Sequence, residues 1–252
     1  YHDWANQIPA ITKQVIAAAK ASGATVIVPG NVYVFGETGG TWDENTPHRA
    51  TSRKGRIRIE MEEAYRASGV QTILLRAGNF IDPDRNGDVF SIVTIPDPAK
   101  RRITSLGDPA AVQSWVWMPD WARAAAELAE MRQSLARFED IPMPGLSFSH
   151  DELADRLGAL TGERYQIKRF PWMLMRIAAP FWELAREMLD MRGLYDTPHR
   201  LGSAKFDHLM PDFRATSLDD VLNRLVLDPQ VGPDHSMRSG GKTVIADQSS
   251  TG

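Results

Sequence analysis

Apolar residues recur at two different spacings near the start of the chain. Residues 8 to 21 place their apolar side chains on one face of a helix, and Gly23 follows shortly after, as is typical of a helix end. Residues 25 to 28 are a short, β-branched apolar run bounded by Pro29 and Gly30. Such a run is typical of a buried parallel strand. The pattern predicts a surface helix followed by a buried strand.

The same order is then repeated. Residues 52 to 68 have apolar positions at helical spacing, Gly69 closes the helix, and residues 70 to 78 form a second strand-like run. Two helix-strand units in succession favour parallel strands joined by right-handed crossovers. The expected fold class is therefore α/β, with a parallel sheet.

Later segments carry recognisable helix starts. A carboxylate at Asp120 is expected to cap the helix that follows a tryptophan-rich strand, and residues 140 to 145 are expected to form a further strand. Ser149 opens a capping box with the glutamate three residues on, and another helix should begin near Thr216 or Ser217. The C-terminal part is thus expected to be mostly helical.

Residues 171 to 192 are rich in Trp, Met and Phe and are interrupted by Pro180. A membrane-surface helix has a basic polar face, whereas the charges here are of mixed sign, which favours a role in the core or in lining a cleft. Beyond Pro229 the sequence is polar and aperiodic, and we expect residues 231 to 252 to be a disordered tail.

Composition narrows the classes of partner. The 252 residues include 29 Lys and Arg against 32 Asp and Glu, a net charge of −3, which disfavours nucleic acid as a partner. No apolar run approaches the roughly 20 residues that span a bilayer, and no secretory pattern opens the chain, so we expect a cytoplasmic protein with no membrane partner. The absence of cysteine excludes disulfides and thiolate catalysis.

The stretch from Thr25 to Glu60 carries the most specific pattern: TVIVPGNVYVFG, a polar loop, and then SRKGRIRIE. It resembles the middle of an extended short-chain dehydrogenase/reductase, in which a strand ends in Ser or Thr and the next helix carries Tyr-x-x-x-Lys. Lys54 matches the lysine, while Ala50 stands at the tyrosine position and Asn31 at the hydroxyl position. The chain is most similar to atypical members of the epimerase/dehydratase group, with the usual proton relay missing.

The resemblance implies roles for three side chains. Lys54 would hydrogen-bond the nicotinamide ribose, and the amide of Asn31 would polarise a substrate carbonyl. Tyr33 is the nearest phenol and is a weaker candidate for a replacement acid and substrate contact. Each has a plain alternative: a solvated helix lysine, a turn asparagine and a packing tyrosine. Arg56 and Arg58, on the same helix as Lys54, are expected to form a solvated face.

A second match, LLRAGNF over residues 74 to 80, resembles the Arg-Pro-x-Asn loop of the family. Ala77 replaces the proline. Asn79 and Phe80 keep plausible contacts with the nicotinamide, and Asn79 also with substrate. With Pro29, Gly30 and Asn31 at the end of the preceding strand, these residues complete the expected cofactor contacts. A simple turn remains the alternative.

The resemblance also implies an N-terminally truncated, Rossmann-like chain that starts just past the fourth strand of the family fold. Residues 1–135 would be a partial NAD(P)-binding domain, and residues 136–230 a mostly helical substrate-side region. No glycine-rich phosphate-binding turn occurs in the sequence, so NAD cannot be distinguished from NADP. The expected substrate is a small carbonyl compound or nucleotide sugar, and a homodimer is left open. The alternative is a non-catalytic dinucleotide-binding or regulatory protein.

The sequence contains only incomplete versions of metal-binding and phosphate-binding motifs. Residues 82 to 88 begin like a calcium loop, but Val93 occupies the position of the bidentate glutamate. The sequence SGGKT lacks the first glycine and the preceding strand of a P-loop. The six histidines show no metal-binding spacing, although His48 lies in the loop before the lysine-bearing helix. No metal is expected.

Overall fold

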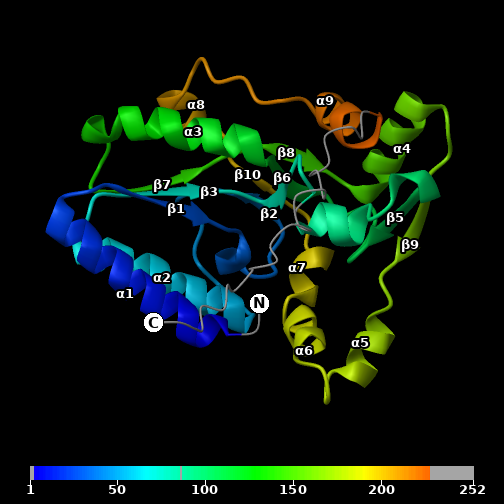
Figure 1. Cartoon of the computed structure of the whole chain (residues 1–252), viewed down its shortest axis with the longest axis horizontal. Helices are drawn as coiled ribbons and strands as arrows, with labels where there is room; N and C mark the ends of the chain where they lie inside the picture. Colours follow the sequence, from blue (N-terminus) through cyan, green and yellow to red (C-terminus); the bar gives the residue numbers. More distant parts are fainter. Residues whose placement is uncertain (1–2, 86, 228–252) are drawn as a thin grey trace, which may run out of the picture.

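A parallel three-stranded sheet lies between two layers of helices in the computed structural model, which describes residues 3–85 and 87–227 (Figure 1). Its strands lie in the order β1-β3-β7. Helices α1 and α2 cover one face, and α3 and α8 cover the other. The expected α/β, Rossmann-like class is confirmed. These elements are β1 (Val26–Gly30), β3 (Thr72–Arg76), β7 (Phe138–Pro142), α1 (Trp4–Ser22), α2 (Arg53–Ser68), α3 (Met118–Glu130) and α8 (Ala204–Leu209).

The strand register aligns the carboxyl ends of all three strands. Gly30 pairs with Arg76, and Arg76 pairs with Pro142. The first two predicted strands, β1 and β3, are parallel as expected, and they are neighbours in the sheet. Among the described residues no strand pairs with the outer edge of β1, where Pro29 is exposed. Proline suits such an edge because it has no amide hydrogen to leave unpaired.

Local sequence explains where the two helices beneath the sheet begin and end. Ser52 caps α2 by accepting a hydrogen bond from the Gly55 amide at 3.0 Å. Gly23 and Gly69 end α1 and α2 in the left-handed region, both with φ of 71°, which costs glycine little. The predicted boundaries of both helices are confirmed to within a few residues.

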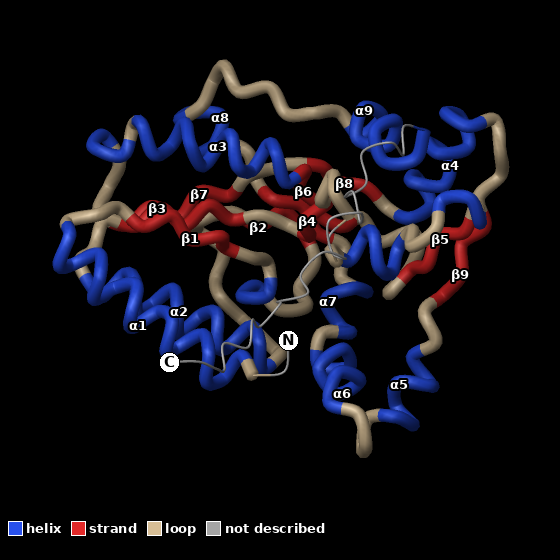
Figure 2. Tube along the Cα trace, viewed as in Figure 1, coloured by secondary structure: helices blue, strands red, loops and turns tan. Residues whose placement is uncertain are grey.

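The rest of the chain surrounds the carboxyl ends of the sheet, as the strands and helices in Figure 2 show. One further sheet has the order β4-β6-β8, and β10 pairs with β2 and β5 with β9. The additional elements are β2 (Gly40–Trp42), β4 (Asn79–Ile81), β5 (Arg102–Ser105), β6 (Gln113–Trp117), β8 (Leu146–Phe148), β9 (Gln166–Arg169), β10 (His199–Leu201), α4 (His150–Thr161), α5 (Trp172–Ala178), α6 (Glu183–Asp190), α7 (Arg192–Asp196), α9 (Leu218–Leu222), η1 (Tyr33–Phe35), η2 (Phe90–Thr94), η3 (Pro98–Lys100), η4 (Arg132–Ser134) and η5 (Asn223–Leu227).

Two apolar clusters hold these parts together. One lies between the three-stranded sheet and α3 and includes Ile73, Leu75 and Leu128, all fully buried. The other joins β4 and β6 to α4 and α9 through Trp115 and Leu153. Each fully buried aliphatic or aromatic side chain contributes about 1.5–3 kcal/mol. Because β7 lies beyond residue 135 and completes the sheet, both halves of the chain build the same core.

Three helix starts test the sequence interpretation. Ser149 and Ser217 cap α4 and α9 through the amides three residues on, as predicted. The cap predicted for Asp120 is wrong. Its carboxylate instead accepts hydrogen bonds from the backbone and hydroxyl of Thr216 at 2.7 and 3.0 Å, and pairs with Arg123. Asp120 therefore fastens the segment before α9 to α3.

The expectation that residues 171 to 192 form core or line a cleft is wrong for six of their large apolar side chains, which are exposed. Phe181 is 94% exposed and Met173 71%. Within the described part of the chain, no helix has the length and apolarity required to cross a membrane. The tail predicted for residues 231 to 252 lies outside the described residues.

Candidate functional site

Lys54 lies in the first turn of α2, close to the carboxyl end of β1, and is only 2% exposed. Its ammonium is 2.7 Å from a carboxylate oxygen of Glu187 in α6 and 5.7 Å from the ring centre of Trp4. A solvated helix lysine is therefore excluded. Burying an amine is costly unless it is paired, and the carboxylate of Glu187 provides a partner for Lys54.

The start of α2 is fastened to α6 at a second point. The amide of Arg53 donates to a carboxylate oxygen of Asp190 at 2.8 Å. The first amides of a helix lack internal partners and carry positive partial charge, so an aspartate placed there is stabilising. Two acidic residues of α6, Glu187 and Asp190, thus hold the N-terminal turn of α2. Neither was identified from the sequence.

Asn31 follows β1 and shapes the turn into η1. Its side-chain oxygen accepts the amide of Tyr33 at 3.1 Å, and its backbone oxygen accepts from Arg76 at 2.6 Å. This is the turn geometry that asparagine favours. The aromatic rings of Tyr33 and Trp4 stack with centres 6.3 Å apart, so Tyr33, Trp4 and Lys54 form one group.

The loop after β3 is tied to the end of β1. The amide of Ala77 donates to the carbonyl of Gly30 at 3.1 Å, and Ala77 is fully buried. Asn79, in β4, is partly buried and lines a small cavity with Gln113 and His150. Phe80 packs edge-on against Trp121 of α3, with ring centres 5.8 Å apart. The predicted residues therefore do not form a single site: Tyr33 and Lys54 group with Trp4, whereas Asn79 lines this small cavity.

A buried charged cluster lies beneath the strand ends. Arg76 is fully buried, and one nitrogen lies 2.9 Å from Glu62 of α2 and 2.6 Å from Asp140 of β7. Burial lowers the pKa of Arg76, but Asp140 and Glu62 outweigh this and raise it overall. The sequence interpretation treated Arg76 only as part of a loop match and did not find this cluster.

Arg58 is also buried, although the sequence predicted a solvated face for it. Its guanidinium donates to the carbonyl of Pro29, and burial lowers the pKa of Arg58. Arg56, two residues earlier, is exposed as expected. With Arg76 on the carbonyl of Asn31, two arginines fix the backbone at the end of β1.

His48, Glu62 and Asp140 place ligand atoms within 4.8 Å of one another, a spacing that suits a metal ion. Arg76 already holds both carboxylates, however, and supplies the positive charge that a metal would bring. Burial lowers the pKa of His48, with Glu62 opposing the shift. The donor set therefore favours a structural ion-pair network over a metal centre.

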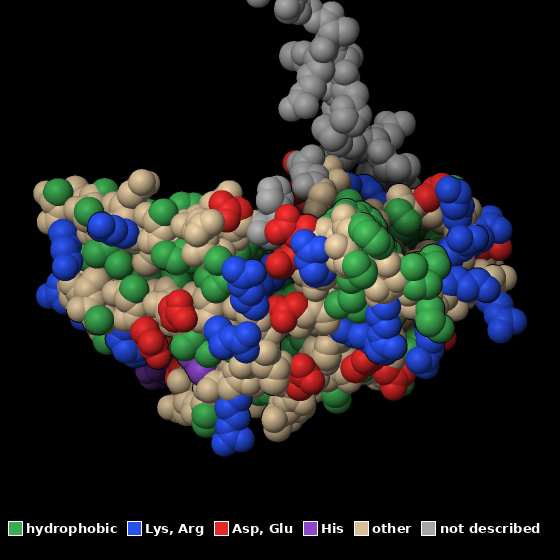
Figure 3. Space-filling view, turned by 90° about the horizontal axis from the view of Figure 1, so that it is seen from below, with side chains coloured by type: hydrophobic (Ala, Val, Ile, Leu, Met, Phe, Trp, Pro, Cys, Tyr) green, Lys and Arg blue, Asp and Glu red, His purple; other side chains and the backbone are tan. Residues whose placement is uncertain are grey.

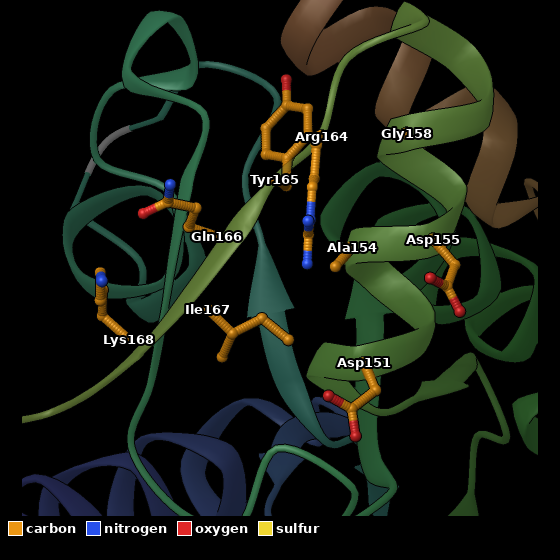
Figure 4. Close-up of a pocket in the computed structure, with 9 residues that line it drawn as sticks. All are labelled: Asp151, Ala154, Asp155, Gly158, Arg164, Tyr165, Gln166, Ile167 and Lys168. Atoms are coloured by element: carbon orange, nitrogen blue, oxygen red, sulfur yellow. The ribbon is translucent and has the colours of Figure 1, made fainter.

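An open groove of about 830 Å³ lies between α4 and β9 (Figure 4). Asp151 and Asp155 project from α4, and Gln166 and Lys168 belong to β9 across from it. None of the residues predicted for the site lines this groove. It is a charged surface feature separate from the ends of β1 and β3.

Comparison with solved structures establishes the class of fold. The chain has the fold of extended short-chain dehydrogenases/reductases of the epimerase and dehydratase kind. No protein-family model matches the chain, and no curated protein matches it by sequence. The structural likeness extends over most of its length.

Three solved structures illustrate the likeness. UDP-glucuronic acid 4-epimerase from Bacillus cereus, in complex with UDP-glucuronic acid and NAD, is 15% identical with a TM-score of 0.68, over 87% of this chain and 67% of that one. DesIV, a dTDP-glucose 4,6-dehydratase from Streptomyces venezuelae, is 18% identical with a TM-score of 0.62, over 86% and 63%. A GalE-like L-threonine dehydrogenase from Cupriavidus necator is 18% identical with a TM-score of 0.67, over 90% and 80%. The chain thus spans roughly two thirds to four fifths of these proteins.

Proposed function

We propose that this protein is an NAD(P)-dependent epimerase/dehydratase-like or reductase-like protein that acts on a small carbonyl compound or nucleotide sugar. The observation that carries the proposal is the burial of Lys54 in the first turn of α2, which packs at Gly55 against Tyr33 in the segment that follows β1. Ligands bind at strand ends in open α/β sheets. Similar structures solved with NAD and with UDP- or dTDP-linked ligands support the substrate class.

The residues present suit the nicotinamide end of the cofactor. The ammonium of Lys54 lies 2.7 Å from a carboxylate oxygen of Glu187. Because an ammonium has three N–H donors, Lys54 can also donate a hydrogen bond to a ribose hydroxyl. The backbone at Pro29 and Gly30 and the loop from Ala77 to Phe80 would flank the ring. Bound NAD(P) would supply the hydride acceptor and donor; NAD versus NADP is left open.

The residues of the substrate side have more limited chemistry. Asn31 would orient a substrate oxygen through its amide hydrogens, since its carbonyl oxygen already accepts from Tyr33. Tyr33 is the phenol nearest to Lys54 in this group and is the candidate proton donor. Asn79 would contact substrate from the small cavity that it lines with Gln113 and His150. The same proposal includes the division of the chain into a cofactor-binding part, residues 1–135, and a substrate-side part, residues 136–230. It also includes the formation of a homodimer.

A non-catalytic dinucleotide-binding or regulatory protein is the second candidate. Two observations favour it: Ala50 cannot exchange a proton, and the ammonium of Lys54 is held by a carboxylate. An ammonium paired in this way is less free to lower the pKa of a neighbouring phenol. Such a protein would bind the cofactor without turnover.

Titration of the full-length protein with NADH and NADPH, followed by nicotinamide fluorescence, tests the proposal. We expect binding that weakens about tenfold in Lys54→Ala, as for the loss of a charged hydrogen bond of about 1.5 kcal/mol, and is unchanged in Arg56→Ala on the exposed face of the same helix. No affinity for either nucleotide would refute it. Binding without oxidation or epimerisation of any UDP- or dTDP-sugar would select the second candidate.

A further inference from the structure

Three polar side chains on one face of a sheet line the small cavity at Asn79. Asn79 of β4 is paired in register with Trp115 of β6, and Gln113 precedes Trp115 by two positions. Because alternate residues of a strand share a face, these three side chains lie on the same side of the sheet. His150, the first residue of α4, completes the group, with its ring edge-on to that of Trp115 and the ring centres 6.4 Å apart.

Two of these side chains carry a buried nitrogen without a partner. Trp115 is 3% exposed and His150 is 7% exposed. Neither Nε1 of Trp115 nor Nε2 of His150 makes a hydrogen bond within the described part of the chain. A buried polar group that stays unpaired is costly, and most such groups in proteins have partners. Two of them in the lining of one cavity therefore indicate that the cavity receives a polar group.

The two nitrogens have opposite hydrogen-bonding roles. Nε1–H of Trp115 can only donate. The hydroxyl of Ser105 donates to the backbone oxygen of Gly107 at 2.9 Å, so the hydroxyl oxygen accepts Nδ1–H of His150 at 3.1 Å. Burial lowers the pKa of His150 to about 4, so at pH 7 the ring is neutral and Nε2 has a free lone pair. The lining therefore offers one donor and one acceptor.

The cavity is small and uncharged. Its volume of about 10 Å³ leaves room for one group of the size of a water molecule or a hydroxyl. Lys, Arg, Asp and Glu side chains are spread over the surface in Figure 3, but none of the described residues that line the cavity is of these types. A phosphate would be too large and would find no cation there. Asn79 and Tyr195 are partly exposed, so the rest of a bound molecule would extend past them.

The walls of the cavity are held in place by hydrogen bonds. Gln113 donates to the backbone oxygens of Tyr195 and Thr197 at 3.1 and 3.0 Å, which attaches β6 to the end of α7. Ser105 of β5 fixes the ring of His150 in the same way. Groups that are already in position lose little conformational freedom when a ligand binds, which favours selective binding.

We propose that this cavity is a hydroxyl-binding subsite, in which one substrate hydroxyl accepts from Nε1 of Trp115 and donates to Nε2 of His150. A hydroxyl does both at once, whereas a carbonyl only accepts and an ammonium only donates. The inference rests on the proposed function and deepens it, because it makes the substrate a hydroxy-carbonyl compound whose bound end is uncharged. Asn79 would contact the same molecule where it leaves the cavity. A small hydroxyketone and the sugar of a nucleotide sugar share this chemistry.

Nitrogen-15 NMR of the indole groups in the full-length protein tests the subsite. We expect hydroxyacetone to shift the Trp115 indole signal saturably, and acetone, which lacks the hydroxyl, to bind about tenfold more weakly or worse. Trp115→Phe identifies that signal by its loss. The indole signal of Trp182, which is 46% exposed, should not move.

UDP-glucose and UDP distinguish the two sources of the hydroxyl. A shift with hydroxyacetone alone selects the small hydroxyketone, and a shift with UDP-glucose that UDP does not reproduce selects the sugar of a nucleotide sugar. The proposal is overturned if neither hydroxyacetone nor UDP-glucose shifts the Trp115 signal. It is also overturned if acetone or UDP shifts the signal equally well.

A substitution of the acceptor gives a second test. His150→Phe keeps a ring but removes Nε2, and it should weaken binding of the ligand that shifts the Trp115 signal about tenfold, followed by saturation-transfer NMR of that ligand. His208→Phe, at an exposed position, should bind as the unmodified chain does. Equal binding by both variants would contradict the assignment of His150. If His150→Phe does not fold, the comparison of hydroxyacetone with acetone still decides, because it uses the unmodified chain.

Titrations with and without NADH separate this subsite from the proposed function. Binding of NADH with no shift of the Trp115 signal by hydroxyacetone or UDP-glucose would overturn the subsite alone. A shift by either compound in a protein without affinity for NADH or NADPH would refute the proposed function and leave the hydroxyl-binding cavity standing.

Discussion

Buried Lys54 of α2 and partly buried Glu187 of α6 form an ion pair, with nitrogen and oxygen 2.7 Å apart. The pair joins the helix beneath the sheet to the helical region that follows the sheet in sequence. The side chain proposed to meet the cofactor is therefore also a structural contact. Any movement of α6 would change the environment of the ammonium.

Glu187→Ala should destabilise the protein, because it leaves the Lys54 ammonium buried without its carboxylate. We expect a loss of about 3 kcal/mol in the free energy of unfolding, measured by urea denaturation. Glu183→Ala, at an exposed position of the same helix, should change it by less than about 0.5 kcal/mol. Equal effects of the two substitutions would show that the pair contributes little.

Arg76→Met should be more damaging, since it leaves Glu62 and Asp140 buried side by side with no cation. The expected loss is about 3–5 kcal/mol in the free energy of unfolding. Arg123 is the matched control, because it is 44% exposed in its pair with Asp120. Arg123→Met should cost less than about 1 kcal/mol. A stable Arg76→Met protein would show that the ion-pair cluster contributes little to the free energy of unfolding.

The sequence predicted the helix-strand order well because that order depends on local periodicity. The caps at Ser149 and Ser217 follow from short-range rules and were confirmed, as was the expectation of parallel strands. The Arg76 cluster could not be predicted, because its charges come from α2, β3 and β7, and only the folded sheet brings them together. Burial of Arg58 was missed for the same reason, since helical spacing alone does not reveal the Pro29 carbonyl.

For the hairpin formed by α5 and α6, the sequence predicted burial where the structure shows exposure. Its apolar composition predicts burial, but neighbours for Phe181 and Met173 depend on where the hairpin points. Lys54 was singled out from the sequence, whereas its partner Glu187 carried no recognisable motif. Whether Lys54, Asn31 and Asn79 act on a cofactor or substrate stays a prediction.

Stability should fall below neutral pH because of two buried histidines. Burial lowers the pKa of His150 and of His199 to about 4. Each histidine binds a proton near pH 6.5 in the unfolded chain but only near pH 4 in the native state. Its contribution to the free energy of unfolding is therefore fully present above pH 6.5 and is lost as the pH falls from 6.5 to about 4. The loss reaches about 3 kcal/mol per histidine.

Urea denaturation at pH 7 and pH 5 measures this dependence. The backbone oxygen of Thr197 can only accept, so Nδ1 of His199 donates to it and Nε2 is buried without a partner. His199→Gln should reduce the difference in stability between the two pH values, although it also costs stability at pH 7. His208→Gln, at an exposed position, should leave the difference unchanged. An unaltered difference in His199→Gln would contradict the assignment.

Gly78→Ala should disturb the loop that carries Asn79. A side-chain carbon at Gly78 would lie 2.1 Å from the backbone oxygen of Ser114, so the loop or β6 must shift. We expect a loss of about 2 kcal/mol or more and a lower melting temperature. Gly158→Ala, in α4, is the control, because the nearest atom is 3.5 Å away. It should stabilise the protein by about 0.5–1 kcal/mol, and a loss at Gly158 would refute the steric explanation.

The three-way sharing of Arg76 constrains how this chain can evolve. A neutral replacement of Arg76 alone leaves the carboxylates of Glu62 and Asp140 buried without a cation. Loss of either acid alone removes one of the two negative charges that pair with the buried guanidinium. Drift at these positions must therefore pass through costly single changes or through simultaneous ones. Homologues should keep the arginine and its two acids together, or exchange all three for a neutral set.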